Sequence, residues 1–225
     1  MGDIPGEGRP TAGARSSWPI TSRETAHGGA PARARYNDSM SVQLTRHRFT
    51  VDDYHAMAEA GALREDDRVE LIEGEIVDMT PIGLRHMAAV DILTRRLTLG
   101  CGERAIVRVQ GAIQLGPHSE PQPDLVVLKP RDDFYRTKAA TADDVLLLIE
   151  VADSSLQFDR TVKLPLYARA GVREVWLVDL VRDEVEVHGD PGPEGFRRTE
   201  TCGRGTRLEP AAFPDVSLAV DELMG

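Results

Sequence analysis

One apolar run constrains the fold of this chain more than any other stretch. Residues Val145–Val151 read Val-Leu-Leu-Leu-Ile-Glu-Val, which is typical of a strand buried on both faces. A helical pattern over Asp159–Ala170 follows and stops at Gly171, and Val172–Asp179 is again a strand pattern. Strand, helix and strand in such close succession form a βαβ unit, whose strands are parallel and whose crossover is right-handed. The chain is therefore predicted to be an α/β protein.

Glu150 is the exception within this run. A carboxylate inside a buried strand costs several kcal/mol unless a positive charge lies against it. Either a basic side chain or a metal ion must therefore compensate Glu150.

The length and composition predict one sizeable domain with an N-terminal tail. The chain has 225 residues, 41% of them hydrophobic and 28% charged. Residues 1–40 are rich in Gly, Pro, Ser and Ala without apolar periodicity, which predicts a disordered tail. Met40 opens the first patterned stretch and is a second candidate for the start of translation. We therefore predict a tail over residues 1–40 and a folded domain over residues 41–225.

The sequence also predicts where in the cell the protein is found and which partners it binds. No segment approaches the roughly 18 consecutive apolar residues of a membrane helix, and the N-terminus lacks a signal-peptide core. Cys101 and Cys202 have no metal-ligand spacing. We predict a cytoplasmic protein without a membrane partner. The net charge of −10 argues against binding nucleic acid by broad phosphate neutralisation, but it is compatible with acids that bind divalent ions.

The remaining patterns predict further elements and one irregularity. Pro165 lies inside the predicted helix, so we expect a kink or a restart next to Lys163. The other predicted elements are a helix from Phe49 with Thr50 as N-cap, a hairpin over 68–79 turning at Glu73-Gly74, a helix over 86–97 with Met87, Val90, Leu93, Arg96 and Leu97 near one face, and strands over 105–115, 123–128, 184–188, 196–201 and 206–208, with a turn at Asp190.

Two acids and a lysine are the candidate catalytic residues of this sequence. Asp124 begins one buried strand and Glu150 ends another, and such an oxygen-rich pair suits Mg²⁺ or Mn²⁺. Lys163 shares a helix face with Asp159 and Tyr167 at spacings of four residues. A lysine there can orient water or stabilise charge on a phosphate oxygen. The pattern indicates metal-assisted phosphodiester hydrolysis.

These residues resemble a known signature. Pro123-Asp124 followed by Glu150-Val151-Ala152 is similar to the PD-(D/E)XK pattern of restriction-endonuclease-like proteins, except that alanine stands at 152 where lysine is expected. A lysine displaced to the next helix, as Lys163 would be, is a variation of that superfamily. Residues 44–222 as a whole resemble the bacterial Uma-two family of restriction endonuclease-like domains. The segments that carry this resemblance are Val69–Ile76, Pro121–Val127, Ile149–Ser155 and Tyr167–Asp179, together with His86, Asp159 and Lys163.

The resemblance implies a restriction-endonuclease-like mixed β-sheet flanked by helices, with the βαβ unit at the active site, and a Mg²⁺-dependent enzyme that cleaves DNA. The predicted catalytic residues are Asp124, Glu150, Lys163, Asp159 and Glu70. The predicted metal ligands are Asp124, Glu150 and the carbonyl of Val151. Glu70 is favoured over Glu73 because it lies within its strand, and His86 is expected to pack or cap a helix.

Several alternatives stay open. Glu150 can belong to a structural ion pair, and Asp159 and Lys163 to a solvated surface pair. The alanine at 152 and the acidic charge favour a binding module that has lost catalysis, while hydrolysis of a small phosphate ester would also suit an acidic protein. Gln110, Gln114 and the basic loop Lys129–Lys138 are candidate substrate contacts. A homodimer is one assembly that the sequence leaves open.

Overall fold

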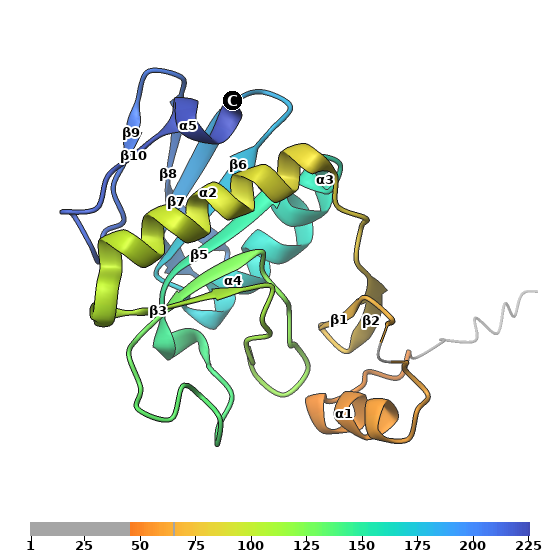
Figure 1. Ribbon diagram of the computed structural model, residues 1–225. Helices are drawn as coiled ribbons and strands as arrows, with labels where there is room; N and C mark the ends of the chain where they lie inside the picture. Colours follow the sequence, from red (N-terminus) through yellow and green to blue (C-terminus); the bar gives the residue numbers. More distant parts are fainter. Residues whose placement is uncertain (1–45, 65) are drawn as a thin grey trace, which may run out of the picture. The chain divides into compact units, whose positions relative to one another are not determined.

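A six-stranded mixed sheet forms the centre of the fold (Figure 1). The computed structural model describes residues 46–64 and 66–225, which belong to one compact unit, Thr45–Gly225. Strands β5 and β6 are parallel and every other neighbouring pair in this sheet is antiparallel, which confirms the predicted α/β fold with its βαβ unit. In spatial order the strands are β3 (Ile106–Val109), β4 (Leu125–Leu128), β5 (Val145–Ala152), β6 (Glu174–Asp179), β7 (Glu184–Gly192) and β8 (Gly195–Gly203).

The predicted tail over residues 1–40, including Met40, lies outside the described residues. Its disorder and the domain boundary at residue 41 therefore stay predictions.

Alternation along β5 decides which way Glu150 points. Leu147, Ile149 and Val151 belong to the core beneath helix α2 (Leu84–Cys101), which crosses one face of the sheet in Figure 1. Leu148 and Ala152 belong to the core beneath helix α4 (Leu164–Ala170) on the opposite face. Because successive strand residues face opposite sides, Glu150 faces the α4 side. The run is buried on both faces, as its apolar sequence predicts.

The C-terminal segment completes the core on the α2 side. It contains β9 (Arg207–Leu208), β10 (Leu218–Ala219) and α5 (Val220–Met224), and its apolar residues join the core that contains Leu93 and Leu97. Cys101 and Cys202 lie in the same core as free, buried thiols. Within the described part of the chain, no helix is long and apolar enough to cross a membrane.

A small hairpin and a helix stand beside the sheet. Strands β1 (Val69–Ile72) and β2 (Glu75–Asp78) pair through a turn in which Glu73 and Gly74 have φ angles of 50° and 82°. Thr50 caps helix α1 (Val51–Glu59) in a reciprocal capping box with Asp53. Both the hairpin turn and this N-cap are confirmed predictions.

The helix after β5 is irregular, as Pro165 predicts. A short α3 (Leu156–Phe158) is followed by a π-helical turn (Asp159–Lys163), and α4 then begins at Leu164. Pro165 occupies the first turn of α4, where its missing N–H costs no interior hydrogen bond. The restart therefore falls directly after Lys163, and α4 ends at Gly171 with a left-handed φ of 85°.

Two boundaries differ from the sequence predictions. Strand β3 ends at Val109 rather than Leu115, because Gln110 has a φ of 47° and turns the chain out of the sheet. Gln110 and Gln114 therefore do not share a strand face. The predicted turn at Asp190 lies inside β7, and the chain turns between Gly192 and Gly195 instead.

The predicted inner face of α2 is also partly wrong. Met87 is 39% exposed and Arg96 pairs with Glu222 at the surface, whereas His86 and Ala89 are buried. The helix begins two residues earlier than predicted, and its buried stripe follows His86, Ala89, Val90, Leu93 and Leu97.

The hairpin turn offers a test of this fold. A Cβ atom added to Gly74 would lie 2.6 Å from Cβ of Arg48, and its left-handed φ also disfavours a side chain. We expect Gly74→Ala to lower the free energy of unfolding by about 1–3 kcal/mol, the cost of an overpacked site. Gly203→Ala is the control, because nothing lies within 4 Å of its added Cβ. Urea unfolding of both variants checks this, and equal stabilities would contradict the described turn.

Candidate active site

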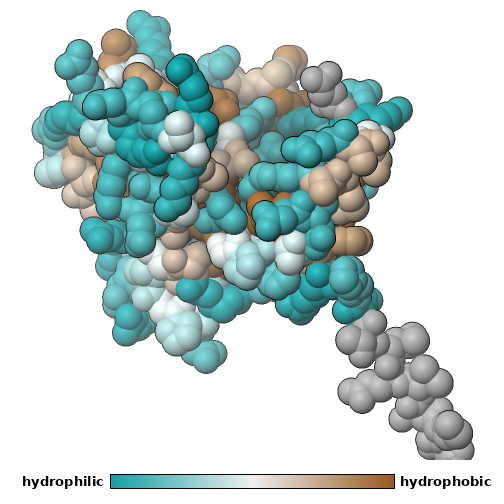
Figure 2. Space-filling view, turned by 90° about the horizontal axis from the view of Figure 1, so that it is seen from below, coloured by the Kyte–Doolittle hydropathy of each residue, from teal (hydrophilic) through white to brown (hydrophobic). Residues whose placement is uncertain are grey.

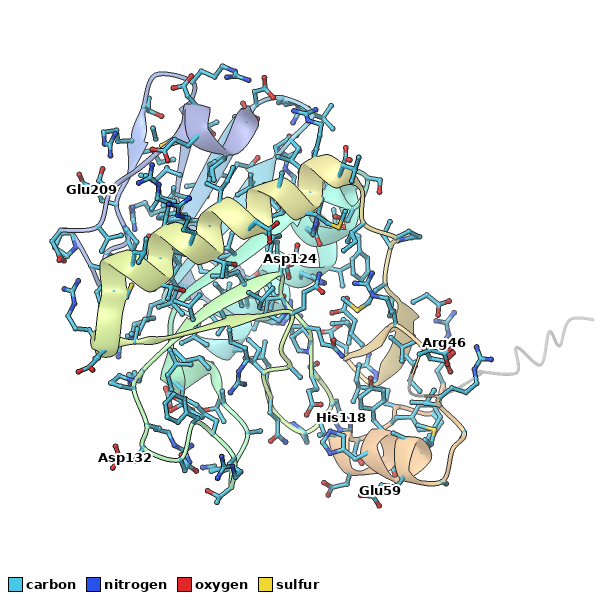
Figure 3. The ribbon with its side chains drawn as sticks, viewed as in Figure 1. Arg46, Glu59, His118, Asp124, Asp132 and Glu209 are labelled. Carbon is cyan, nitrogen blue, oxygen red and sulfur yellow. The ribbon has the colours of Figure 1, made fainter. Side chains whose placement is uncertain are left out.

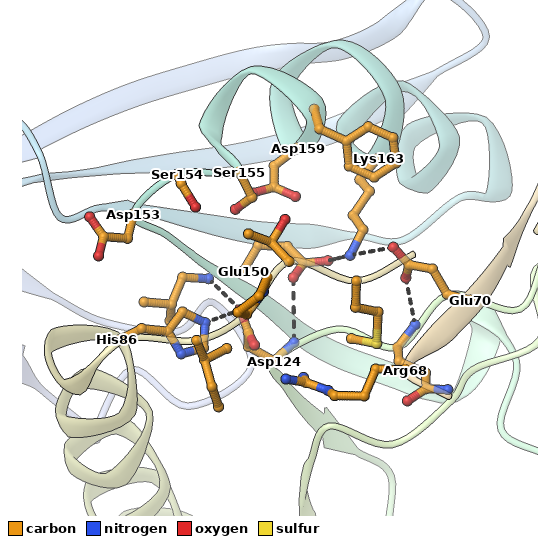
Figure 4. A pocket seen from close by; sticks show the side chains of 18 of the residues that line it. Arg68, Glu70, His86, Asp124, Glu150, Asp153, Ser154, Ser155, Asp159 and Lys163 are labelled. Carbon is orange, nitrogen blue, oxygen red and sulfur yellow. Dashed lines mark hydrogen bonds and ion pairs between the residues drawn. The ribbon is translucent and has the colours of Figure 1, made fainter. Parts of the chain in front are cut away.

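All five predicted catalytic side chains line one pocket at the carboxyl end of β5. Figure 3 labels Asp124, which lies directly before the interior strand β4, and Figure 4 shows the pocket around it. Glu70 comes from β1, Asp124 precedes β4, Glu150 lies in β5, and Asp159 and Lys163 lie in the π-helical turn. The catalytic roles of these residues remain a proposal.

Lys163 provides the cation that Glu150 requires. Its Nζ lies 3.1 Å from Oε1 of Glu70 and 3.3 Å from Oε1 of Glu150. The three side chains are at most 7% exposed, so this is a buried ionic cluster and not a solvated surface pair. The two carboxylates come from separate sheets, and Lys163 joins them.

Tyr167 supports the same carboxylate from one helical turn further along. Its hydroxyl donates to Oε1 of Glu150 at 2.5 Å, and the Tyr167 side chain is fully buried. The sequence places Tyr167 on the face of Lys163, and the structure confirms that the two residues point to the same side. Glu150 therefore receives hydrogen bonds from Tyr167 and the Asp124 amide (3.4 Å), besides its contact with Lys163.

Asp124 is held by two donors. Its Oδ2 accepts the backbone N–H of Val151 at 2.9 Å and lies 3.0 Å from Nε2 of His86. The contact of Val151 with this site therefore involves its amide, and a metal-binding role of its carbonyl stays a proposal.

His86 is a site residue that the sequence analysis missed. Its side chain is buried, lines the pocket and contacts Asp124 from the first turn of α2. Nδ1 of His86 is a buried atom without a hydrogen-bond partner among the described residues. The sequence did contain a signal for the burial of His86, because Ala89 and Val90 follow it by three and four residues and so lie on the same helix face.

Asp159 lies in the pocket but contacts Ser155 rather than Lys163. The hydroxyl of Ser155 donates to Oδ2 of Asp159 at 2.6 Å. No ion pair within 4.0 Å joins Asp159 and Lys163, because the π-helical turn changes the spacing expected of an α-helix. The predicted contact between these two side chains is therefore absent, although both are buried.

Glu70 and Glu73 separate as the sequence suggests. Glu70 is 2% exposed and also accepts the backbone N–H of Gln122 at 3.1 Å. Glu73 stands on the hairpin turn and pairs at the surface with Arg169 of α4.

The basic loop Lys129–Lys138 is not part of this pocket. Leu125 pairs with Ile149 near Asp124 and Glu150, whereas Leu128 pairs with Val145 at the other end of both strands. The loop joins β4 to β5 at that distant end, as the positions of Asp132 and Asp124 in Figure 3 show.

Burial and like charges perturb the proton affinities of the cluster. Burial, reinforced by Asp159, Asp124 and Glu70, raises the pKa of Glu150 to about 8 although Lys163 opposes the shift. Burial alone lowers the pKa of Lys163, but Glu150, Glu70 and Asp159 outweigh it and raise the pKa above its ordinary value. Lys163 is therefore a fixed cation, whereas Glu150 is ready to lose its proton when a second cation arrives.

The pocket has an excess of negative charge that one lysine cannot neutralise. Six acids line it and only two basic residues, Arg68 and Lys163, so the fully ionised pocket has an excess of four negative charges. The acids are Glu70, Asp78, Asp124, Glu150, Asp153 and Asp159.

Oxygen donors of this kind fit a hard divalent cation. No group of three or more His, Cys, Asp or Glu side chains that could hold a metal ion is found within residues 46–64 and 66–225. An open arrangement still fits Mg²⁺, which typically binds one or two carboxylates and keeps several waters for exchange with substrate phosphates. The residues present therefore fit the predicted Mg²⁺ or Mn²⁺.

The raised pKa of Glu150 predicts a pH dependence of stability. Between its ordinary pKa of 4.5 and its folded pKa of about 8, the unfolded chain releases this proton and the folded chain retains it. The contribution of Glu150 to the free energy of unfolding is therefore largest below pH 4.5. It declines as the pH rises to 8, by roughly 1.4 kcal/mol for each unit of difference between the two pKa values.

Urea unfolding between pH 5 and 9 in chelator measures this effect. The stability of the unsubstituted protein relative to Glu150→Gln should decrease across this range, since glutamine does not titrate. A difference that is constant or increases with pH would contradict the raised pKa. Lys163 adds no slope, because its raised pKa lies above this range.

Comparison with known proteins agrees with this fold. Residues 51–221 match the Uma2 family, described as "Putative restriction endonuclease". A crystal structure of a "putative nuclease belonging to DUF820" from Anabaena variabilis has a TM-score of 0.63 with this chain at 19% identity, over 78% of this chain and 97% of that one. This structural likeness supports the fold alone. No curated protein matches the sequence.

Proposed function

This chain belongs to the Uma2 family of restriction-endonuclease-like nucleases, and we propose that it is a divalent-metal-dependent endonuclease that hydrolyses DNA phosphodiester bonds. One observation carries the proposal: Asp124 and Glu150, on neighbouring strand ends, share a pocket with the buried ammonium of Lys163. Acidic ligands and a fixed cation placed in this way suit metal-assisted phosphodiester cleavage.

Asp124, Glu150 and the carbonyl of Val151 would hold Mg²⁺ or Mn²⁺. When bound, the metal supplies Lewis acidity toward a phosphate oxygen and lowers the pKa of a coordinated water. His86 and the Val151 amide keep Asp124 in place, and Tyr167 does so for Glu150. These contacts limit the freedom of both carboxylates before any ligand arrives.

Lys163 would stabilise the negative charge that develops on the phosphate or orient the attacking water. It remains protonated through the neutral range, so electrostatic stabilisation is the role that its raised pKa favours. Glu70 positions Lys163 through their 3.1 Å ion pair. Asp159 lines the same pocket and would support the hydration of the metal.

Arg68 would bind the substrate phosphate at the mouth of the pocket. It is an exposed residue that lines the pocket, and Figure 4 shows its guanidinium extending beneath Asp124. No ion pair to Arg68 is found among the described residues. An unpaired guanidinium offers two parallel N–H donors to a phosphate.

The alternative of a binding module without catalysis rests on the alanine at position 152. Ala152 is fully buried in the core beneath α4 and has no polar group to offer. Lys163 reaches Glu150 from the following helix and supplies the ammonium that position 152 lacks. Because Lys163 can take the place of a lysine at position 152, the structure favours an enzyme over a binding module without catalysis.

Substitution of Lys163 tests the proposed mechanism. Lys163→Ala should lower the turnover of plasmid nicking by roughly 100- to 1000-fold, the usual loss for one preorganised electrostatic group. Lys163→Arg should rescue poorly, because a guanidinium differs in shape from an ammonium. Calorimetry of Mn²⁺ binding on the same variants should show a much smaller change than turnover.

Arg169→Ala is the matched control, because Arg169 lies on the next helix and, among residues 46–64 and 66–225, forms an ion pair with Glu73 alone, at the surface. It should nick DNA at the rate of the unsubstituted protein. If Lys163→Ala retains full activity while it stays folded, the proposed role of Lys163 is wrong. Activity on small phosphate esters but not on DNA would favour that alternative substrate class.

A further inference from the structure

An exposed aromatic residue marks the loop at the distal end of β4 and β5. Phe134 is 67% exposed, although large apolar side chains are usually withdrawn from water. The loop lies at the lower end of the molecule in Figure 1, and Figure 2 views that end, where most of the surface is hydrophilic. Among the large apolar side chains that the described part of the chain exposes, Phe134 is the aromatic one.

The backbone beneath Phe134 is strained. Phe134 and Tyr135 have φ angles of 50° and 60°, two consecutive non-glycine residues in the left-handed region. Such conformations persist only where the surroundings impose them, and they concentrate at functional sites.

Asp133 imposes this conformation. Its carboxylate accepts hydrogen bonds from the Arg131 guanidinium, the Tyr135 amide and both the amide and the hydroxyl of Thr137. These bonds, led by the hydroxyl of Thr137, hold the pKa of Asp133 well below its usual range. The turn is thus fixed by a charged group that stays ionised at all ordinary pH values.

Tyr135 fixes the other side of the turn. Its hydroxyl donates to the carbonyl of Lys129 at 2.8 Å, and its ring lies 4.4 Å from the Arg131 guanidinium and 5.4 Å from that of Arg108. Tyr135 is buried while its neighbour Phe134 is exposed. The strained turn therefore directs one aromatic ring inward as an anchor and presents the other to solvent.

Basic residues without an ion pair flank Phe134 on both sides in the sequence. Lys129, Arg136 and Lys138 are exposed, and they take part in no ion pair within the described part of the chain. Residues 129–138 contain four basic and two acidic side chains, an excess of two positive charges in a protein with a net charge of −10. Asp132 is the one exposed acid of this segment.

We propose that Phe134 and the flanking Arg136 and Lys138 form a second contact site for single-stranded nucleic acid, at which a base stacks on Phe134. Aromatic platforms among basic residues bind single strands in this way, since every base has a face that can stack. A duplex keeps its bases stacked on one another, so it offers none to Phe134. An acidic protein segment would use the cations but would gain nothing specific from a rigid exposed ring.

The site deepens the proposed function and rests on it, because a contact far from the pocket matters only for a polymer. From Asp124 to Leu128 the strand spans about 14 Å, at about 3.4 Å per residue. A nucleic-acid strand that occupies both the pocket and the Phe134 site must therefore extend several nucleotides beyond the scissile bond. The acidic pocket repels this polymer when no metal is bound, so the loop would provide the first attachment.

Fluorescence anisotropy of labelled single strands tests the proposal. The strands have about 20 nucleotides, which is longer than the binding site of a typical single-strand-binding domain. Chelator is present, so that no metal-dependent cleavage occurs. Phe134→Ala should weaken binding by roughly 5- to 150-fold, the equivalent of one lost base stack. Phe134→Trp should retain affinity, and its fluorescence should be quenched by the bound strand. Leu99→Ala is the control, because Leu99 is 73% exposed and lies on α2, outside the loop.

The salt dependence tests the two cations separately. Replacing Arg136 and Lys138 by Gln should reduce the slope of log Kd against log salt by about 1.4, which corresponds to two phosphate contacts of a single strand. Arg95→Gln, an exposed cation on α2, should leave the slope unchanged. DNA and RNA strands are both tested, because stacking does not distinguish them.

The outcomes separate this proposal from the proposed function. Loss of binding in Phe134→Ala with retained binding in Leu99→Ala supports the site, even if no variant cleaves DNA and the proposed function fails. Equal affinity of Phe134→Ala and the unsubstituted protein would overturn the site, even if both cleave DNA. Preference for an acidic peptide or for duplex over single strands would also overturn it.

Discussion

The compensation of Glu150 by Lys163 is the interaction on which the rest of the site depends. A buried carboxylate in the central strand requires a cation, and Lys163 supplies it from the helix that follows the same strand. Because Lys163 also pairs with Glu70, the β1–β2 hairpin is fixed against the main sheet by the same charge. One ammonium thus joins elements that are far apart in the sequence. Removing Lys163 would leave two buried carboxylates without their shared cation, so this cluster contributes to the structure as well as to the proposed site.

The compensation of charge in the pocket is incomplete, and this incompleteness suits the pocket to the proposed divalent ion. Two buried carboxylates share one lysine, and further acids surround them, so the pKa of Glu150 is raised rather than lowered. A site that was already neutral would gain nothing from a divalent ion. Here the bound ion would offset repulsion that the empty site retains.

The irregular helix explains how the lysine reaches its position. Pro165 prevents a continuous α-helix from Leu156 to Ala170, and the π-helical turn that replaces its first part buries both Asp159 and Lys163. The helix restarts at once, so Tyr167 still faces Glu150. The local irregularity of the backbone and the geometry of the pocket therefore have the same cause.

The sequence predicts the βαβ unit well, because an apolar run, a helical pattern and a glycine stop are local signals. It predicts that Asp124, Glu150 and Lys163 converge, since strand ends and a helix face bring them together. It favours Glu70 as a further site residue because Glu70 lies within its strand. It does not predict His86, whose contact with Asp124 depends on how α2 crosses the sheet. The end of β3 is missed for a similar reason, because the turn at Gln110 is set by its backbone conformation rather than by its residue type.

Thermal unfolding with and without divalent ions tests the central claim most directly. If the uncompensated acids form a metal site, millimolar Mg²⁺ or Mn²⁺ should raise the melting temperature of the unsubstituted protein. At a metal concentration of about 100 times the Kd, the free energy of unfolding should increase by about 2.7 kcal/mol. The same ions should leave Glu150→Gln unchanged, since that variant lacks one of the two carboxylate ligands. An equal rise in both proteins, or no rise in either, would contradict the account.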